Sequence, residues 1–147
     1  MSRFRTIASL KKYFKIQELV CPHTYKKYGE YSWQYLSTCY LETLLVVREQ
    51  ILAALMSCNT SNLNQRGLRC NLCPIVSNKQ SLYLSAQILG KAGDFTVRGL
   101  TAEEARNKII QNAHLLPYPI RVEKNVTWLH IDTLPQHNIV EKVYLFK

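Results

Sequence analysis

The order of the segments with regular apolar spacing constrains the fold of this chain more than any other feature of its sequence. Residues 38–56 carry leucine and isoleucine at helical spacing and follow Ser37, an N-cap residue, so they predict a long core helix. A capping box at residues 101–104 predicts a second helix that ends near His114. The remaining regular segments are short and have the two-residue alternation of strands.

Five short segments are predicted as strands, and a turn at Lys124-Asn125 joins two of them into a hairpin. The segments are residues 62–68, 92–98, 120–123, 126–133 and 143–146. They do not alternate regularly with helices, which argues against a parallel sheet built from repeated strand–helix–strand units. The predicted fold class is therefore α+β, with a small antiparallel sheet and flanking helices.

Length and composition predict a single domain over residues 1–147. A chain of 147 residues with 47% apolar residues can fill one core but is short for two. Residues 1–35 are basic, aromatic and poorly periodic, which predicts an N-terminal extension to a core over residues 36–147. Apolar stretches are too short for a membrane span, and the first residues lack the apolar block of a secretory signal. We therefore expect synthesis in a cytoplasm and no membrane partner.

The net charge of +9 comes from 19 lysines and arginines against 10 aspartates and glutamates. Such an excess favours polyanionic partners, among them nucleic acid, anionic cell-wall polymers and acidic protein surfaces. A basic surface that only keeps the protein in solution explains the charge equally well. Since no RNA- or DNA-binding motif accompanies the charge, nucleic acid is the least favoured of these partners.

Four of the residues that can bind a metal form two short pairs. Cys70-Asn-Leu-Cys73 has the spacing of one half of a structural zinc site, and Cys21-Pro-His23 offers a second half. The remaining cysteines are Cys39 and Cys58. An odd number of cysteines without a secretory signal argues against a disulfide framework. The alternative to a zinc site is a set of reduced, partly buried thiols.

A second group of candidate ligands lies on the predicted strands. Strand alternation places Trp128, His130 and Asp132 on one face of residues 126–133, and Asp94 is an acidic residue of another strand. An imidazole and carboxylates on one face can bind zinc with a position left for water. The alternative is a structural histidine with ordinary hydrogen-bond partners, and an Asp94 that only ends a turn.

These segments resemble the D-Ala-D-Ala carboxypeptidase family, which includes phage endolysin peptidases and shares its zinc fold with the Hedgehog signalling domain. The pattern Ser85-x-x-x-x-Gly90-x-Ala92-x-Asp94 resembles the family signature Ser-x-His-x-x-Gly-x-Ala-x-Asp. Residues 128–132, Trp-Leu-His-Ile-Asp, resemble the strand of the third zinc ligand, and residues 67–69 resemble a segment upstream of the signature. The resemblance covers roughly residues 40–133. It is greatest to versions in tailed phages of gut bacteria.

The resemblance implies a role for each matching residue. Asp94 and His130 would be the second and third zinc ligands, and Arg69 would pair with a carboxylate or carbonyl oxygen of the substrate. Asp132 would be an acid/base carboxylate or a carboxylate that supports the ligands. Glu123 is the rival base, because some members carry a glutamate upstream of the last ligand.

The first ligand position departs from the family, because Gln87 stands where the signature has histidine. A neutral amide oxygen is a poor zinc ligand compared with an imidazole. Three explanations follow: a natural inactive relative, an engineered knockout, or a zinc site completed by another residue. The remaining histidines are His23, His114 and His137. None of them has a spacing that recommends it as the missing ligand.

The implied function is a zinc-dependent peptidoglycan peptidase of a bacteriophage, of carboxypeptidase or endolysin type, impaired by Gln87. Its cofactor would be Zn²⁺ and its substrate a peptidoglycan stem peptide. The alternative is a catalytically inactive virion component, bound to other virion proteins, or a cell-wall-binding protein. Either would be made in the host cytoplasm and would act at the cell wall or in the particle. We expect Asp94, His130 and Gln87 to converge on one cleft, with Arg69 at its rim.

Overall fold

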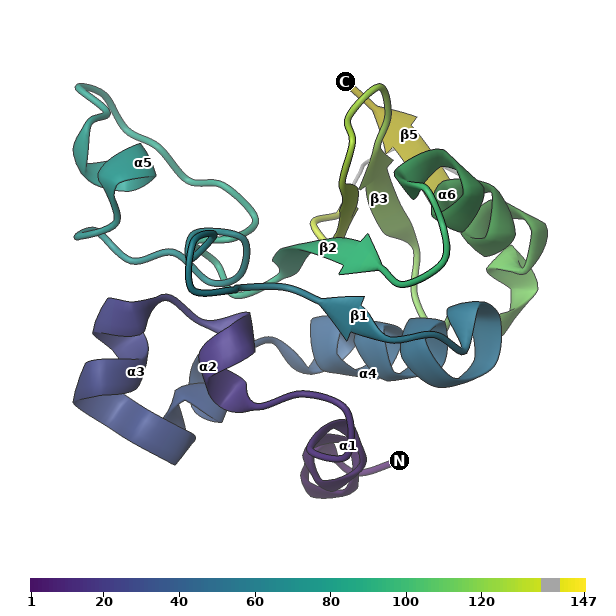
Figure 1. Cartoon of the computed structure of the whole chain (residues 1–147), viewed down its shortest axis with the longest axis horizontal. Helices are drawn as coiled ribbons and strands as arrows, with labels where there is room; N and C mark the ends of the chain where they lie inside the picture. The colour runs from purple at the N-terminus through teal and green to yellow at the C-terminus, as the bar shows by residue number, and fades with distance from the viewer. Residues whose placement is uncertain (136–140) are drawn as a thin grey trace.

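The fold combines one five-stranded sheet with short helices, as Figure 1 shows for the computed structural model, which describes residues 1–135 and 141–147. The helical segments are α1 (Arg3–Leu10), α2 (Ile16–Leu19), α3 (Pro22–Tyr28), η1 (Gly29–Tyr35), α4 (Thr38–Val46), η2 (Val47–Leu52), α5 (Pro74–Ser77), α6 (Ala102–Gln111) and η3 (Ala113–Leu115). The strands are β1 (Met56–Ser57), β2 (Ala92–Val97), β3 (Ile120–Glu123), β4 (Leu129–Asp132) and β5 (Val143–Phe146). Within the described residues, no helix is both long and apolar enough to cross a membrane.

The sheet has the order β1-β2-β4-β3-β5, and its centre is the antiparallel pair of β2 and β4. This pairing places Asp94 opposite His130, as their expected convergence requires. The antiparallel pairing of β3 with β4 is also confirmed, but their connection runs over residues 124–128 instead of the predicted two-residue turn, and Asn125 in it takes a left-handed φ of 63°. The α+β class is therefore confirmed, and β2, β3, β4 and β5 lie within their predicted ranges, whereas β1 lies at the end of the segment predicted as the long helix.

The prediction of an antiparallel sheet is wrong at its edge, because β5 runs parallel to β3. Asp132 at the end of β4 lies opposite Arg121, near the start of β3. The chain that leaves β4 enters β5 at this same end, where Val143 pairs with Ile120. A strand that begins beside the start of β3 must run in the direction of β3, so the sheet is mixed.

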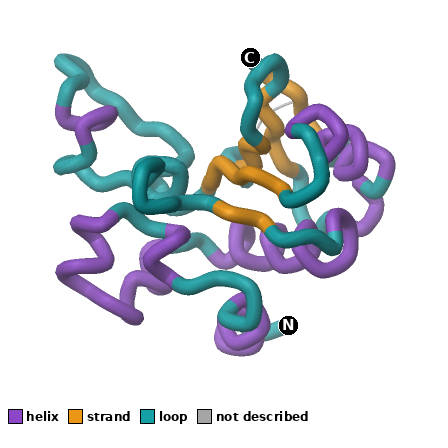
Figure 2. The backbone as a smooth tube through the Cα atoms, viewed as in Figure 1, coloured by secondary structure: helices purple, strands orange, loops and turns teal. Residues whose placement is uncertain are grey.

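The predicted strand over residues 62–68 is also wrong. Only Leu68 makes a strand-like bridge there, to Val20, and the rest is an irregular loop (Figure 2). The side chain of Asn59 organises this loop, since its Oδ1 accepts from the Arg66 amide and its Nδ2 donates to the Val20 carbonyl. The long helix ends earlier than predicted: a π-helical turn follows α4, and Ala53 in the left-handed region ends it.

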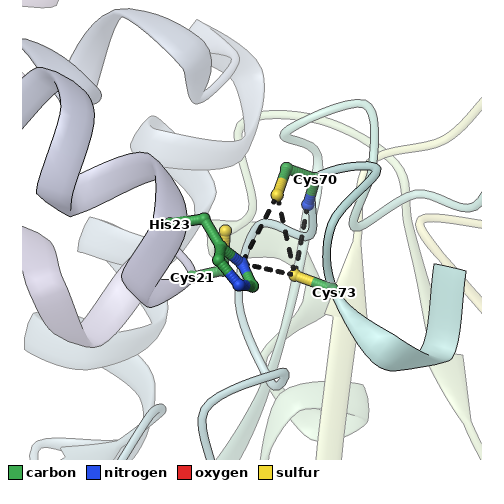
Figure 3. Close-up of side chains that lie close together, drawn as sticks. All are labelled: Cys21, His23, Cys70 and Cys73. Carbon is green, nitrogen blue, oxygen red and sulfur yellow. Dashed lines mark hydrogen bonds between the residues drawn. The ribbon is translucent and has the colours of Figure 1, made fainter. Parts of the chain in front are cut away.

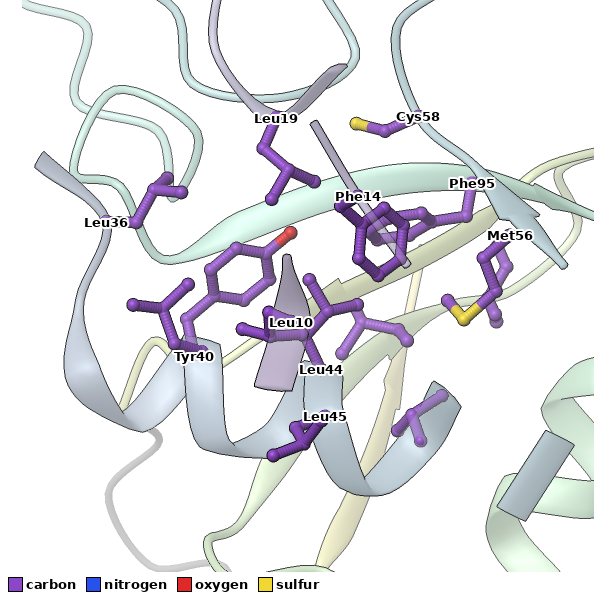
Figure 4. Close-up of a cluster of buried hydrophobic side chains, with 14 of the residues drawn as sticks. Leu10, Phe14, Leu19, Leu36, Tyr40, Leu44, Leu45, Met56, Cys58 and Phe95 are labelled. Carbon is purple, nitrogen blue, oxygen red and sulfur yellow. The ribbon is translucent and has the colours of Figure 1, made fainter. Parts of the chain in front are cut away.

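The N-terminal segment belongs to the same packed interior as the rest of the chain. Figure 4 shows Leu10, Phe14 and Leu19 packed among side chains of α4 and β2. The ring of Phe14 meets that of Phe95 in β2 edge-on at 6.1 Å. The structure therefore differs from the predicted division at residue 36: the first 35 residues, though poorly periodic, supply core side chains from short helices.

Candidate functional site

The pairing of β2 with β4 brings Asp94 and His130 together at the centre of the sheet. The two residues are directly opposite each other, and Nδ1 of His130 lies 2.7 Å from Oδ1 of Asp94. Gln87 reaches the same carboxylate from the turn before β2, where its Nε2 donates to Oδ2 of Asp94 at 3.3 Å. Gly90 makes this turn possible: its φ is +68°, and a Cβ there would collide with the carbonyl of Tyr35.

Arg69 completes this group from the loop after Leu68. Its Nη2 lies 3.9 Å from Oδ2 of Asp94, and its backbone amide donates to the Gln87 carbonyl at 3.3 Å. Its Nε donates to the carbonyl of Gln65 at 2.7 Å. Asp94, His130, Gln87 and Arg69 thus converge as expected from the sequence.

Asp132 has no solvent exposure, and its carboxylate is fully engaged. Oδ2 lies 2.7 Å from Nε2 of His130, and Arg121 donates to both oxygens at 2.8 and 2.9 Å. Arg121 was not among the candidates from the sequence, because a two-residue turn at Lys124-Asn125 would place it opposite Trp128 and not opposite Asp132. Phe146 of β5 covers the group, with its ring against both Arg121 and His130.

His130 is therefore held between two carboxylates, which sets its protonation. Burial disfavours the charged imidazole, but the hydrogen bonds to Asp132 and Asp94 outweigh this and raise the pKa of His130 to about 9. Burial likewise opposes ionisation of Asp132, while His130 and Arg121 hold the pKa of that carboxyl below its usual range. The raised pKa of His130 and the lowered pKa of Asp132 both favour a protonated imidazolium at neutral pH, with a proton on each ring nitrogen.

Asp94, His130 and Gln87, to which the resemblance assigns the zinc, bond to one another and do not face a common ligand position. Both ring nitrogens of His130 face carboxylates, and Gln87 presents its amide nitrogen to Asp94. No other histidine completes the set among the described residues: His23 lies in a separate cluster, and His114 lies in η3. His137, the third candidate, lies outside the described residues.

Glu123, the rival base, lies at the turn end of β3, where its backbone carbonyl accepts a hydrogen bond from Arg106. Within the part of the chain that the structure describes, no hydrogen bond or ion pair joins its carboxylate to Asp94 or His130.

A pocket of about 480 Å³ opens beside Asp94. Arg66 and Arg69 contribute positive charge to its wall, and Trp128 and Leu63 contribute apolar surface. Arg66 is fixed by bonds from its guanidinium to the Cys58 carbonyl and the Thr96 hydroxyl. Its side chain is therefore preorganised, as that of Arg69 is.

The second candidate group, Cys21, His23, Cys70 and Cys73, is brought together as predicted. Figure 3 shows the four side chains pointing toward one another from the start of α3 and the loop before α5. Their ligand atoms all lie within 4.8 Å of one another. Nδ1 of His23 is 3.6 Å from the sulfur of Cys70 and 3.8 Å from that of Cys73, and the two sulfurs are 3.9 Å apart. These four residues, the Cys/His cluster, can hold a metal ion.

The backbone around the Cys/His cluster supports both halves. Cys21 donates its amide to the Leu68 carbonyl and Leu68 donates to Leu19, so the two segments run side by side. The amides of Leu72 and Cys70 point at the sulfurs of Cys70 and Cys73, each at 3.4 Å. These amide contacts hold the two sulfurs toward the centre of the cluster. Cys39 and Cys58 lie apart from this group as free thiols.

Comparison with known proteins gives no significant match to this chain, whether with family models, with curated proteins or with solved structures.

Proposed function

We propose that this chain is a peptidase-like domain of a bacteriophage that binds peptidoglycan stem peptides with little or no hydrolysis. The observation that carries the proposal concerns the pocket lined by Arg66 and Arg69, here called the arginine pocket. Its two arginines are preorganised, while Asp94, His130 and Gln87 beside it bond to one another and are not arranged as zinc ligands. The resemblance in sequence supplies the substrate class, and Gln87, which donates to Asp94 rather than ligating a metal, argues against turnover.

The pocket suits a short peptide that carries a carboxylate. Arg66 and Arg69 offer two guanidinium groups for that carboxylate or for a backbone carbonyl. Asp94 accepts hydrogen bonds and can take an amide N–H or an ammonium group of the same peptide. Trp128, which is 38% exposed, offers an apolar face to its side chains. Such a domain would act at the host cell wall, either carried in the particle beside other virion proteins or released there.

The proposal assigns zinc to the Cys/His cluster, in a structural role. Three thiolates and one imidazole are a common ligand set for structural Zn²⁺. In a tetrahedral site, Zn–S bonds of about 2.3 Å separate the sulfurs by roughly 3.8 Å. The 3.9 Å between the sulfurs of Cys70 and Cys73 supports this assignment. Metal analysis of the purified chain should give one zinc per molecule.

The experiment is a binding assay on purified peptidoglycan sacculi, with released material analysed by mass spectrometry. We expect saturable binding without stem-peptide products, and about tenfold weaker binding for Arg69→Ala because a charge-assisted contact is lost. Lys108→Ala, a change of the same charge on α6, is the matched control and should bind normally. Products that disappear in Asp94→Ala would favour the impaired peptidase instead, and absent binding would overturn both forms of the proposal.

A further inference from the structure

The Cys/His cluster lies next to the wall of the arginine pocket, because Cys70 directly follows Arg69 in the chain. We infer that the metal bound by this cluster holds Arg69 in its position in the pocket, and that Gln65 transmits the constraint. The inference rests on the proposal that zinc occupies the cluster, and it does not depend on which ligand the pocket takes.

The link from the cluster to Arg69 consists of two hydrogen bonds on one residue. Cys73 precedes α5, and the amide of Ile75 in its first turn donates to Oε1 of Gln65 at 2.9 Å. The backbone carbonyl of Gln65 accepts from Nε of Arg69 at 2.7 Å. Gln65 is therefore bound at its side chain by the loop of the cluster and at its main chain by the arginine.

The loop that supplies Ile75 has almost no core of its own. Between residues 71 and 84, Cys73 is the only buried residue, and most others are exposed. Figure 1 shows the loop with α5 extending away from the sheet, above α3. Since burial cannot fix such a segment, its position depends on the sulfur atoms of Cys70 and Cys73 being tied to Cys21 and His23.

The main chain before Arg69 is fixed in another way. Gly67 packs so closely on Leu19 that a Cβ would collide with the Leu19 carbonyl, and Leu68 is paired with the same segment. This contact holds the backbone of residues 67 and 68 whether or not a metal binds. What the metal adds is the position of α5, of Gln65 and, through Gln65, of the Arg69 side chain.

The test follows the Nε–H signal of Arg69 in ¹H–¹⁵N spectra of the full chain, assigned with Arg69→Lys. Arg121, whose Nε donates to Asp132 on the far side of His130, supplies an internal reference from the same spectrum. In the zinc-loaded chain both signals should be protected from exchange with water. After chelation the Arg69 signal should exchange at least about tenfold faster while the Arg121 signal is unchanged.

Variants of the exposed residue His23 separate the metal from the fold. His23→Ala should weaken zinc binding and speed exchange at Arg69, whereas His23→Cys offers four thiolates and should restore both. Cys39→Ser, at an exposed cysteine outside the cluster, should change neither. If the Arg69 signal of the folded metal-free chain stays protected, the inference is wrong.

Gln65→Ala keeps the test decisive even if the chelated chain unfolds. It removes the Oε1 acceptor and leaves all four ligands, so zinc content should stay at one per chain while Arg69 exchanges about tenfold faster. Unchanged exchange in this variant would exclude Gln65 as the link. If the zinc-loaded chain protects the Arg69 Nε–H from exchange but does not bind stem peptides, the proposed function is wrong and this inference still stands.

Discussion

The Cys/His cluster and the Asp94–His130 site differ in how their polar atoms are satisfied. Both join segments that are far apart in sequence: Cys21 meets Cys70 in one, and Asp94 meets His130 in the other. In the Asp94–His130 site, carboxylates take up both ring nitrogens of the histidine, and Arg121 balances the charge. In the Cys/His cluster, three sulfurs and one ring nitrogen face one another at distances that suit a shared cation.

The comparison teaches that convergence of suitable residue types does not make a metal site. Asp94 and His130 lie together as expected from the sequence, yet Gln87 meets Asp94 as a hydrogen-bond donor. The carboxylates of Asp94 and Asp132 bond to the two ring nitrogens of His130. The residues of the Cys/His cluster follow a less regular spacing in sequence than those of the Asp94–His130 site. Their sulfurs and ring nitrogen, however, do not pair with one another as closely as His130 pairs with its two carboxylates. Three changes test this difference.

The largest effect is expected for Cys73→Ser, which removes a buried ligand of the Cys/His cluster. Loss of structural zinc removes folding free energy, so we expect the free energy of unfolding to fall by about 4–6 kcal/mol, with loss of bound zinc. Thermal melting and metal analysis measure both. Cys39→Ser is the matched control and should melt like the unchanged chain. An unchanged melting temperature in Cys73→Ser would make these residues ordinary thiols.

A smaller effect is expected from pH at the Asp94–His130 site. The pKa of His130 is about 9 in the folded chain and about 6.5 when unfolded. Its contribution to stability is therefore full below pH 6.5 and is lost as pH rises through 9. The shift corresponds to about 3 kcal/mol.

The control for this pH effect is Asp132→Asn, which removes one of the two carboxylates around His130. Because both chains share all cysteines and tyrosines, the difference in their stability isolates this site. We expect denaturant titrations to show a difference that shrinks between pH 6.5 and 9. A difference independent of pH would mean that His130 is neutral in the folded chain.

The smallest effect on stability, and the sharpest on chemistry, is expected for Gln87→His. An imidazole at this position removes the amide donor and completes a set of one aspartate and two histidines. We expect a second zinc per chain, bound at least about tenfold more tightly at this site than in the unchanged chain, which is about 1.4 kcal/mol. Calorimetric titration measures it.

Cleavage of stem peptides by Gln87→His would show that Arg69 and Asp132 still serve catalysis. A second zinc without cleavage would show that the surroundings have changed beyond the ligand. If zinc stoichiometry stays at one, Gln87 does not occupy the position of the first ligand, and the transfer of the family site is wrong.

The sequence predicted those parts of the molecule that depend on local pattern. Alternation and capping located β2, β3, β4 and α6, and the spacing of Cys21-x-His23 and Cys70-x-x-Cys73 predicted the ligands of the Cys/His cluster. What failed depends on contacts between distant segments. The direction of β5 follows from where β4 ends, and the packing of Phe14 against Phe95 has no local signal.

The protonation of His130 was likewise beyond the sequence analysis. It required both carboxylates to be placed on opposite nitrogens of one ring, and Arg121 to be placed on Asp132. Strand alternation gives the face on which a residue lies, but not which of its atoms meets which partner.

The separation of Cys21 from Cys70 has a consequence for the time course of folding. The two halves of the cluster can meet only after the intervening 48 residues, which include α4 and β1, have closed into a loop. A growing chain on the ribosome cannot complete the site until Cys73 has emerged. Contacts that form this late stabilise the native state more than the transition state. Zinc should therefore mainly slow unfolding and so prolong the lifetime of the folded protein, while the folding rate stays almost unchanged.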